Sequence, residues 1–480
     1  MMVPFRQNIV IIGCGSVAQC TLPILFNLID ILPSSVTIID FVDNRSAIEP
    51  FIRRGVRYEQ VRLTQENYQE ILINCLSPGD LLVDLAWNLE TASLIEWCQQ
   101  RQVRYINTSL ELWNPFDHYA IRDPRELTLY HRQMRLKDRL AALEKKGPTA
   151  IIDHGANPGL VSHFVKQGLI DIAQELLKRP LAAERQVGLE QALHHLDFPR
   201  LAQAIGLKTI HISERDTQIA NDPKRVNEFV NTWSVEGIIE EGMAPSEIGW
   251  GTHERQLPPG ALLHSKGPGN QICLSQKGIH TWVRSWVPSG PIVGMVIRHG
   301  EAFSLSQFLT VYQDGQTVYR PTVHYAYCPC DSTINSLQEL HMRAYRPQKE
   351  RRILSHEILS GSDELGCLLM GHDLKAWWIG SILDIEEARR LVPGQNATTV
   401  QVAIGVVAAI IYAIRHPQEG CCLPDDLNYQ EIMEIAKPYL GQFLSQQVDW
   451  SPLSDVQAFL PFNASLPKEE DEWQFATFRV

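Results

Sequence analysis

NIVIIGCGSVAQCTLPIL, residues 8–25, is the stretch that decides the fold of this chain. Apolar residues typical of a buried strand lead into a glycine pair, and a run with helical composition follows. The pattern is G-x-G-x-x-A, in which glycine permits a tight turn and close approach of the backbone to a pyrophosphate. The N-terminus of the following helix supplies amide donors and a favourable dipole. The sequence therefore predicts a dinucleotide site with a turn at Gly13, Gly15, Ser16 and Val17.

The rest of the first 150 residues continues this alternation of strands and helices. Strand-like runs such as SSVTIIDF and GDLLVDLA alternate with helix-like runs such as ENYQEILINCL and ETASLIEWCQQRQ. Short alternating units of this kind are typical of a doubly wound parallel sheet. We therefore predict an α/β fold with a Rossmann domain over residues 1–155.

Acidic and polar residues follow the predicted strands of this domain. Asp40 ends the second main strand, where an acid accepts hydrogen bonds from a ribose 2′-hydroxyl and repels a 2′-phosphate. The cofactor is therefore predicted to be NAD rather than NADP. Asp84 and Thr108 lie at further strand ends, where open α/β sheets bind ligands, and both are candidate cofactor contacts.

A second region, residues 156–384, has a different pattern. It opens with a helix over 159–179 and a second near 184–204, and strands dominate from about 209 to 383. Asp314-Gly315 predicts a hairpin within them. Few crossover helices are predicted between these strands, with one expected at STINSLQELHMR. We therefore expect an α+β substrate domain with a mixed sheet.

The remaining residues, 385–480, are predicted to be mainly helical. The most apolar run, QVAIGVVAAIIYAIRH at 401–416, is shorter than the roughly 18 residues that suggest a membrane span. It is interpreted as a buried core helix. We expect this C-terminal region to pack on the Rossmann domain or at a dimer interface.

Composition narrows the functional classes. The 480 residues carry a formal net charge of −12, which argues against a nucleic-acid-binding protein and suits a cationic substrate. The ten cysteines show no C-x-x-C spacing, so no metal site is predicted. The start of the chain reads as a strand rather than a signal peptide. A cytoplasmic protein with reduced thiols and no membrane partner is expected.

A tryptophan among carboxylates marks the second region. TWSVEGIIEEG, residues 232–242, combines Trp233 with Glu236, Glu240 and Glu241. An indole face attracts an alkylammonium and the acids neutralise its charge, and a desolvated cation–π contact is worth ~2 kcal/mol. The alternative is a core tryptophan beside a solvated acidic face.

Several motifs together resemble bacterial homospermidine synthase, a family of saccharopine-dehydrogenase-like reductases. They are IIGCGSVAQ, DHGANPGLVSHFVK, ISERDTQ, TWSVEGIIEEG, GWGTHE and VIRHGEAFSLS, and they extend over almost the whole chain. The resemblance implies a Rossmann domain, an α+β domain that closes the site, and a homodimer. It also implies that two putrescines become symmetrical homospermidine and ammonia with NAD retained. Spermidine is a further possible donor of the aminobutyl group in this family.

The resemblance also implies roles for individual residues. Trp233 would hold a cationic aminobutyl group through its ring, and Glu241 would recognise an outer amine. The inner amine would be lined by Glu214, Asn157 and His299, with Glu111 at the entrance. Asn157 is also a candidate contact of the nicotinamide amide.

Three other functions stay open at this point. A reductase that makes saccharopine or carboxynorspermidine would need Arg or Lys in its pocket for the carboxylates. An enzyme-bound imine would use a lysine, for which Lys166 and Lys266 are the candidates. A Rossmann-fold binding protein would carry no chemistry at all.

Overall fold

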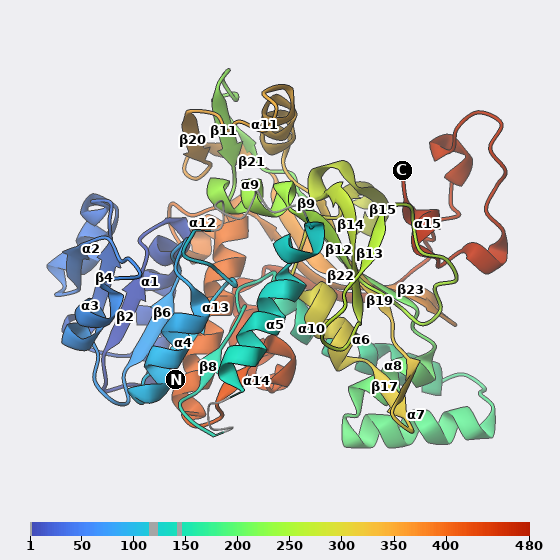
Figure 1. Ribbon diagram of the computed structural model, residues 1–480, viewed down its shortest axis with the longest axis horizontal. Helices are drawn as coiled ribbons and strands as arrows, with labels where there is room; N and C mark the ends of the chain where they lie inside the picture. The colour runs from blue at the N-terminus through green and yellow to red at the C-terminus, as the bar shows by residue number, and fades with distance from the viewer. Residues whose placement is uncertain (1, 115–122, 142–145) are drawn as a thin grey trace.

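A computed structural model describes residues 2–114, 123–141 and 146–480. Its N-terminal part is a parallel sheet of seven strands in the order β24-β8-β7-β6-β2-β4-β5 (Figure 1). The doubly wound parallel sheet predicted from the sequence is confirmed. The strands are β2 (Ile9–Ile12), β4 (Val36–Asp40), β5 (Arg57–Gln60), β6 (Leu81–Asp84), β7 (Arg104–Asn107), β8 (Ala150–Ile151) and β24 (Cys421–Cys422).

Strand residues alternate between two apolar layers. In β2, Ile9 and Ile11 pack on one face of the sheet, while Val10 and Ile12 pack on the other. Because both faces are covered by helices, nearly every residue of the central strands is apolar. The helices of this part are α1 (Ser16–Leu28), α2 (Glu49–Arg53), α3 (Tyr68–Cys75), α4 (Thr91–Gln100) and α5 (Leu129–Leu140). Pro23 lies inside α1 and does not end it.

The core helix expected at 401–416 is α13 (Ala397–Arg415). Along the described chain it is the one helix long and apolar enough to span a membrane, and 89% of its most apolar window is buried inside the molecule. It packs against α1 and the N-terminal sheet, and Figure 1 shows it in orange beside β6 and β8. Its apolar composition is therefore explained by packing within the protein.

The C-terminal region contains more strand than its sequence predicts. β24 joins the N-terminal sheet beside β8, and β25 (Gln442–Val448) joins the second sheet beside β23. The short apolar pair Cys421–Cys422 and the polar, partly exposed strand β25 lack the periodicity that identifies strands. The helices here are α12 (Ile385–Leu391), α13, α14 (Tyr429–Ala436) and α15 (Phe475–Phe478).

The second region is built on a mixed sheet of ten strands. Its main path is β13-β14-β12-β19-β9-β22-β23-β25, with β15 and β16 attached through β19. Only β9 and β19 pair in parallel. The strands are β9 (Thr209–Asp216), β12 (Pro245–Gly249), β13 (Ala261–Leu263), β14 (Gln271–Lys277), β15 (Trp282–Val287), β16 (Gly290–Met295), β19 (Thr322–Cys328), β22 (Ser362–His372), β23 (Lys375–Asp384) and β25.

The helices of the second region differ from the prediction in two respects. The helix expected near 184–204 is two helices, α7 (Ala183–His195) and α8 (Phe198–Ile205), separated by Leu196 in a left-handed conformation. Two helices, α9 (Val235–Met243) and α10 (Glu301–Phe308), lie in the region that the sequence predicts to be dominated by strands. α9 has nine residues and α10 has eight, and six of the eight residues of α10 are buried, so neither helix has a distinct period in the sequence. α6 (Leu160–Leu177) and α11 (Asp331–Met342) match their predicted positions.

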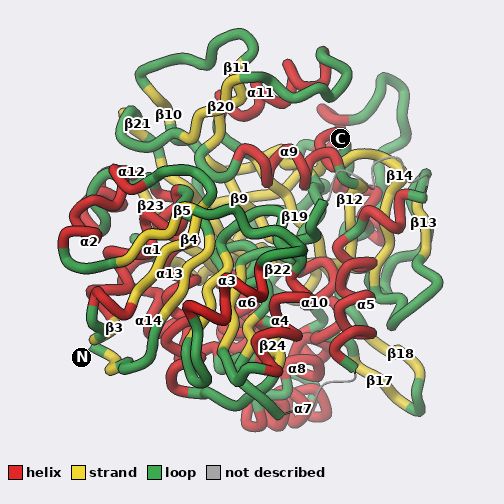
Figure 2. The backbone as a smooth tube through the Cα atoms, turned by 60° about the vertical axis from the view of Figure 1, so that its left-hand side comes forward, coloured by secondary structure: helices red, strands yellow, loops and turns green. Residues whose placement is uncertain are grey.

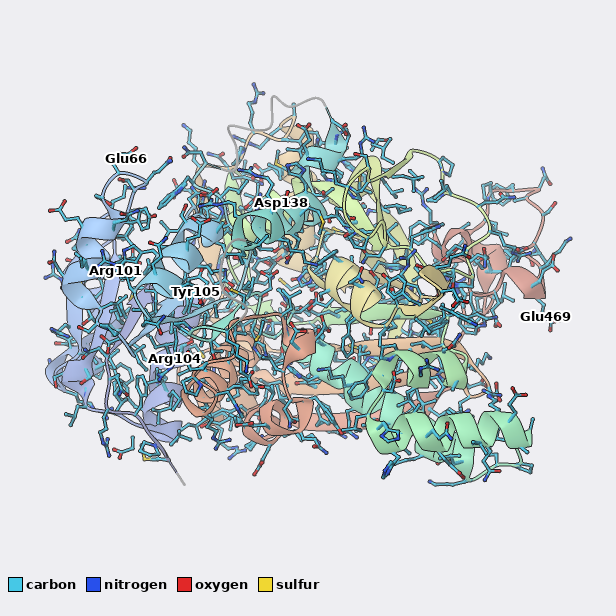
Figure 3. The ribbon with its side chains drawn as sticks, turned by 60° about the horizontal axis from the view of Figure 1, so that its bottom comes forward. Glu66, Arg101, Arg104, Tyr105, Asp138 and Glu469 are labelled. Carbon is cyan, nitrogen blue, oxygen red and sulfur yellow. The ribbon has the colours of Figure 1, made fainter. Side chains whose placement is uncertain are left out.

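Small two-stranded sheets complete the fold. Figure 2 shows β11 (Glu228–Asn231), β20 (Glu350–Ile353) and α11 in a lobe above the main sheet. The predicted hairpin at Asp314-Gly315 is confirmed, since it joins β17 (Val311–Gln313) to β18 (Gln316–Tyr319). The other short strands are β1 (Val3–Pro4), β3 (Ile29–Asp30), β10 (Ile219–Ala220) and β21 (Ile358–Ser360). Figure 3 shows Glu66 near one end of the molecule and Glu469 near the other.

Candidate functional site

The glycine turn fits a dinucleotide phosphate. Gly13 has φ of +91°, and a Cβ atom there would lie 2.8 Å from the carbonyl oxygen of Leu85. A Cβ on Gly15 would meet nothing within 4 Å, so the space in front of α1 is open. Gly15 is also the N-cap of α1 and has no side chain with which to bond the first amides of that helix. The turn thus offers backbone donors and room for an anion.

Asp40 and Asp84 have different surroundings. Asp40 accepts a hydrogen bond from the backbone N–H of Cys14 at 2.6 Å and another from Val42 at 2.9 Å, so it braces the glycine turn. Asp84 is buried and accepts a hydrogen bond at 3.0 Å from the hydroxyl of Tyr105, which Figure 3 labels in the N-terminal sheet. Asp84 does not line the pocket described next, and burial raises its pKa to about 7.

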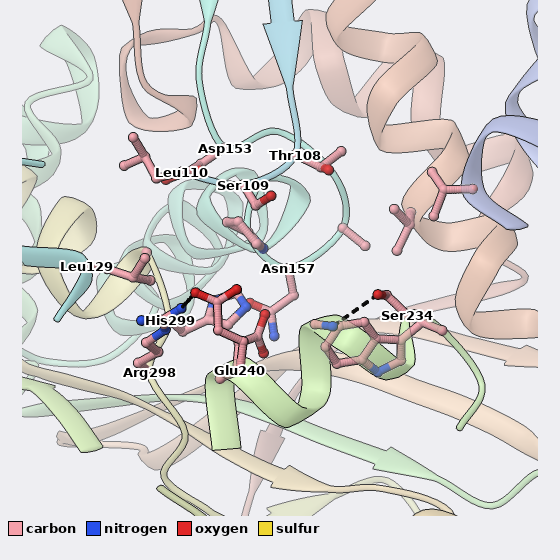
Figure 4. A pocket seen from close by; sticks show the side chains of 18 of the residues that line it. Thr108, Ser109, Leu110, Leu129, Asp153, Asn157, Ser234, Glu240, Arg298 and His299 are labelled. Atoms are coloured by element: carbon pink, nitrogen blue, oxygen red, sulfur yellow. Dashed lines mark hydrogen bonds and ion pairs between the residues drawn. The ribbon is translucent and has the colours of Figure 1, made fainter. Parts of the chain in front are cut away.

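A pocket of about 200 Å³ lies between the carboxyl ends of the parallel strands and the second sheet (Figure 4). It contains all six residues to which the family resemblance assigned catalytic roles, together with two of the expected cofactor contacts. They are Glu111, Asn157, Glu214, Trp233, Glu241 and His299, with Val17 and Thr108. These residues are up to about 280 positions apart in the sequence, and the fold brings them together.

Trp233 lies in the pocket wall at the start of α9. Its indole Nε1 donates a hydrogen bond to the Tyr327 hydroxyl at 3.0 Å, which fixes the ring while leaving it partly exposed. The side chain of Ser234 caps α9 by accepting the N–H of Gly237 at 3.0 Å. A Cβ atom on Gly237 would lie 2.7 Å from Cζ3 of the indole, so the ring occupies the place of a side chain there.

Glu214 is the centre of a cluster of neutral hydrogen-bond donors. Its Oε2 accepts bonds from the Tyr325 hydroxyl and, at 3.4 Å, from Nδ2 of Asn157. Burial raises the pKa of the Glu214 carboxyl. Asn157 does not cap α6, because the N-cap of that helix is Gly159. We call Glu214, Asn157 and Tyr325 the acceptor cluster.

His299 forms a buried pair with Glu301. The Nδ1 atom of His299 lies 2.5 Å from Oε2 of Glu301, whose Oε1 accepts the N–H of Gly159 at 3.1 Å. Burial opposes the charge on His299, but Glu301 outweighs it and raises the pKa of His299 to about 9. The imidazole is therefore cationic at neutral pH. Glu301 was not singled out from the sequence, although it stands two residues after His299.

Another part of the pocket wall carries two arginines. Oε1 of Glu240 lies 2.5 Å from Nη2 of Arg132 and 2.6 Å from Nη2 of Arg298, and Figure 4 shows the pair with Arg298. Its Oε2 accepts the indole N–H of Trp87 at 3.1 Å. Sequence reasoning missed both arginines, because Arg132 stands in a charged amphipathic helix. Arg298 lies directly before His299 in VIRHGEAFSLS, and the family resemblance implies a role for His299 alone. We call Arg132, Arg298 and Glu240 the arginine cluster.

Buried oxygen atoms of the pocket lack donors. Within the described residues, four lining side chains have a buried oxygen with no hydrogen-bond partner, namely Oε2 of Glu111, Oδ1 of Asp153, Oδ1 of Asn157 and Oε1 of Gln401. A buried acceptor without a donor is unfavourable by ~1–3 kcal/mol. A ligand rich in N–H donors would satisfy these oxygens.

The two lysines considered for an enzyme-bound imine lie outside the pocket. Nζ of Lys166 donates to the backbone carbonyls of Asp425 at 2.6 Å and Leu427 at 2.9 Å, so it ties α6 to the C-terminal region. Lys266 is exposed and does not line the pocket. Among the residues that the structure describes, no group of three or more His, Cys, Asp or Glu side chains could hold a metal ion.

Two domain families match the chain. The saccharopine dehydrogenase NADP binding domain matches residues 9–151, and the saccharopine dehydrogenase C-terminal domain matches residues 155–448. The apo saccharopine dehydrogenase (L-Glu forming) of Saccharomyces cerevisiae has the same fold, with a TM-score of 0.52 at 11% identity over 92% of this chain and all of that one.

Closer relatives match over nearly their full length. Homospermidine synthase of Blastochloris viridis is 40% identical over 98% of this chain and 97% of that protein. Homospermidine synthase of Mesorhizobium japonicum is 36% identical over 98% of this chain and 96% of that protein. The crystal structure of the homospermidine synthase of Legionella pneumophila in complex with NAD superposes with a TM-score of 0.88 at 38% identity, covering 100% of this chain and 99% of that one. The chain therefore belongs to the homospermidine synthase family.

Proposed function

We propose that this enzyme joins two putrescine molecules into symmetrical homospermidine with release of ammonia, and that NAD is its retained redox cofactor. The observation that carries the proposal is the set of buried oxygen acceptors without donors in a pocket beside the dinucleotide turn. An alkylammonium supplies N–H donors and positive charge to such a site, so it satisfies the acceptors that the protein leaves open. The similarity of the chain to three homospermidine synthases over nearly its full length supports this assignment.

NAD, when bound, accepts a hydride from the carbon that bears one amine and returns it after the amines have exchanged. The reacting amine must first lose a proton. We propose that Glu214 accepts it, because burial raises the pKa of its carboxyl into the range of a useful base. Asn157 would orient that amine through its free Oδ1. His299 is already protonated at neutral pH, so it would donate a hydrogen bond rather than take the proton.

The cationic carbon–nitrogen species formed on the substrate needs an electron-rich surface. We propose that the Trp233 ring provides it and that Glu241 binds an outer ammonium. Burial raises the pKa of Glu241 to about 7, so an incoming ammonium would shift this carboxyl to its ionised form. Glu111 would guide the amine at the entrance. The reaction also requires that water be kept from the imine, which would otherwise be hydrolysed to an aldehyde.

The cofactor choice rests on the end of β4. Each oxygen of Asp40 accepts one backbone N–H and keeps lone pairs for a ribose hydroxyl. A 2′-phosphate would be repelled by this carboxylate, which supports NAD although the matching domain family is described by NADP. Gly13, Gly15, Ser16 and Val17 would hold the pyrophosphate, with Thr108 nearer the reacting end. The structural surroundings of Asp84 favour a bracing role for that residue.

Incubation of the protein with putrescine and a catalytic amount of NAD tests the proposal. We expect one homospermidine and one ammonia for every two putrescines consumed, without added reductant. Turnover that requires an oxo acid and stoichiometric reduced cofactor would instead indicate a reductase of the saccharopine or carboxynorspermidine type. Bound NAD without any product would indicate a binding protein.

Assembly and substrate range are part of the same proposal. We propose a cytoplasmic homodimer in which residues 1–155 bind the dinucleotide, residues 156–384 bind the amines, and residues 385–480 join the two. Spermidine is proposed as a second aminobutyl donor. Light scattering on the purified chain would test the dimer, and replacement of putrescine by spermidine with labelled putrescine as acceptor would test the donor.

A further inference from the structure

Two guanidinium groups line a pocket that is proposed to bind cations. Arg132 comes from α5 and Arg298 from the segment before α10, and their side chains are only 8% and 5% exposed. Arginine in such a position is what a carboxylate-bearing substrate would need, because the planar guanidinium matches a carboxylate with two parallel hydrogen bonds. Two arginines in the wall of a cation-binding pocket would by themselves repel the substrate.

Glu240 occupies the position that such a carboxylate would take. One oxygen bridges the two guanidiniums at 2.5 and 2.6 Å, and the other accepts the indole N–H of Trp87. Burial would raise the pKa of Glu240, but Arg298 and Arg132 outweigh burial and lower it, so the carboxylate stays ionised at neutral pH. The cluster thus holds one negative charge between two positive ones.

The remaining positive charge faces two further acids. Glu111 and Glu241 line the same pocket, and burial raises the pKa of both carboxyls above the ordinary value for glutamate. Both can ionise when an ammonium arrives. The net charge of the arginine cluster together with these two glutamates is then −1. Without Glu240, the net charge of the other four side chains would be +2 while Glu111 and Glu241 are neutral, and zero once both are ionised.

We propose that Glu240 is the specificity-determining residue that makes this pocket accept amines and reject amines that carry a carboxylate. The inference deepens the proposed function and rests on it. The carboxylate of Glu240 already pairs with both guanidiniums, so the carboxylate of a substrate cannot bind them in the same way. The negative charge of Glu240 also reduces the repulsion between the guanidiniums and a substrate ammonium.

The carboxylate-bearing amine that this pocket would reject is 4-aminobutanoate in the role of aminobutyl acceptor. 4-Aminobutanoate has the same four-carbon chain as putrescine, with a carboxylate in place of one terminal aminomethyl group. As acceptor, its amine nitrogen would form a bond to the carbon of the aminobutyl donor, and the bond from that carbon to the departing ammonia would break. The hydride removed from that carbon returns to it, so there is no net oxidation and the products are N-(4-aminobutyl)-4-aminobutanoate and ammonia.

The first test compares Glu240→Gln with wild type in the NAD-loaded enzyme. The ratio of kcat/KM for 4-aminobutanoate to that for putrescine as acceptor should rise by about tenfold or more, since the change removes one negative charge in a poorly screened site. Glu236→Gln is the matched control. Glu236 stands on the same helix and pairs with Arg351, but outside the pocket, so its ratio should not change.

The second test uses Arg132→Gln, which breaks the same ion pair from the other side and leaves the Glu240–Arg298 pair intact. It removes a positive charge, so we expect the KM for putrescine to fall by several-fold while 4-aminobutanoate remains unused. If Glu240 serves only to hold α5 against α9, Glu240→Gln and Arg132→Gln should impair putrescine turnover to the same extent. Neither variant should then change the ratio of kcat/KM for 4-aminobutanoate to that for putrescine. That result would overturn the proposal.

Removing one partner of a buried ion pair is often strongly destabilising, so the two variants are needed together. If Glu240→Gln does not fold, the putrescine KM of Arg132→Gln decides, and an unchanged or higher KM contradicts the proposal. Failure of the proposed function would be visible separately, because the wild-type enzyme would then make no homospermidine.

Discussion

The acceptor cluster and the arginine cluster hold similar buried groups in one pocket, yet their glutamates behave in opposite ways. Glu240 uses both oxygens on charged or indole donors, and its pKa is lowered. Among the described residues, Glu214 receives hydrogen bonds from a phenol and an amide, and burial raises its pKa. The charge of its partners therefore decides whether a buried glutamate forms a structural ion pair or stays available to bind a cation.

The largest effect should separate the two glutamates directly. Glu214→Gln keeps hydrogen bonds to Tyr325 and Asn157 but removes the charge that a bound ammonium needs. We expect kcat/KM for putrescine to fall by about a hundredfold or more, while the melting temperature is kept. Glu240→Gln should instead lower the free energy of unfolding, by about 3–5 kcal/mol. Equal losses of stability in the two variants would contradict the different roles given to Glu214 and Glu240.

The next effect concerns the ring beside the acceptor cluster. Trp233→Ala removes the cation–π surface, worth ~2 kcal/mol or more, so kcat/KM should fall by about thirtyfold. Bound NAD and the melting temperature should change little, because the indole is partly exposed and lines a pocket. Trp233→Phe is expected to restore part of the activity. Full activity of the alanine variant would rule out the role of the ring.

A smaller effect is expected from the glycine under that ring. Gly237→Ala places a methyl group where Cζ3 of the indole lies 2.7 Å away, so the ring must move. Overpacking of this kind costs about 1–3 kcal/mol, and we expect roughly a tenfold loss of kcat/KM. Gly188→Ala is the control, because a Cβ there meets nothing within 4 Å. Similar losses in both variants would point to a general effect of alanine.

The smallest effect is a shift with pH. Glu301 raises the pKa of His299 to about 9, so this pair stabilises the fold below the ordinary histidine value of ~6.5 and the contribution is lost as the pH rises through 9. Glu301→Gln should therefore lower the melting temperature most at pH values up to about 6.5, and the difference from wild type should shrink as the pH rises towards about 10. It should also move the basic limb of activity to lower pH. A difference independent of pH would contradict the pairing.

The parts of the fold that sequence predicts best are those fixed by local chemistry. The glycine turn, the alternating strands after it and the Asp314-Gly315 hairpin each follow from backbone conformation and periodicity. The strands β24 and β25 could not be predicted, because they are defined by pairing with the distant strands β8 and β23 rather than by a pattern of their own. Helices α9 and α10 were too short for their period to be distinct.

The site was predictable only in part for the same reason. Trp233 and Glu241 stand in one motif, and the family resemblance supplied Glu214, Asn157 and His299. The arginine cluster depends on contacts between α5, α9 and the segment at Arg298, which nothing in the local sequence indicates. Glu240 and Glu241 are neighbours with the same side chain, and only their partners in space distinguish them.

Isotope retention is the sharpest test of whether amine exchange runs to completion within the acceptor-rich pocket. Putrescine with deuterium at both terminal carbons would be converted in the presence of excess unlabelled NADH, and the mass of the triamine measured. The account predicts that the triamine keeps every deuterium, because the hydride taken from the donor carbon returns to it before anything leaves the pocket. Loss of deuterium from that carbon, or release of an aldehyde in place of the triamine, would contradict it.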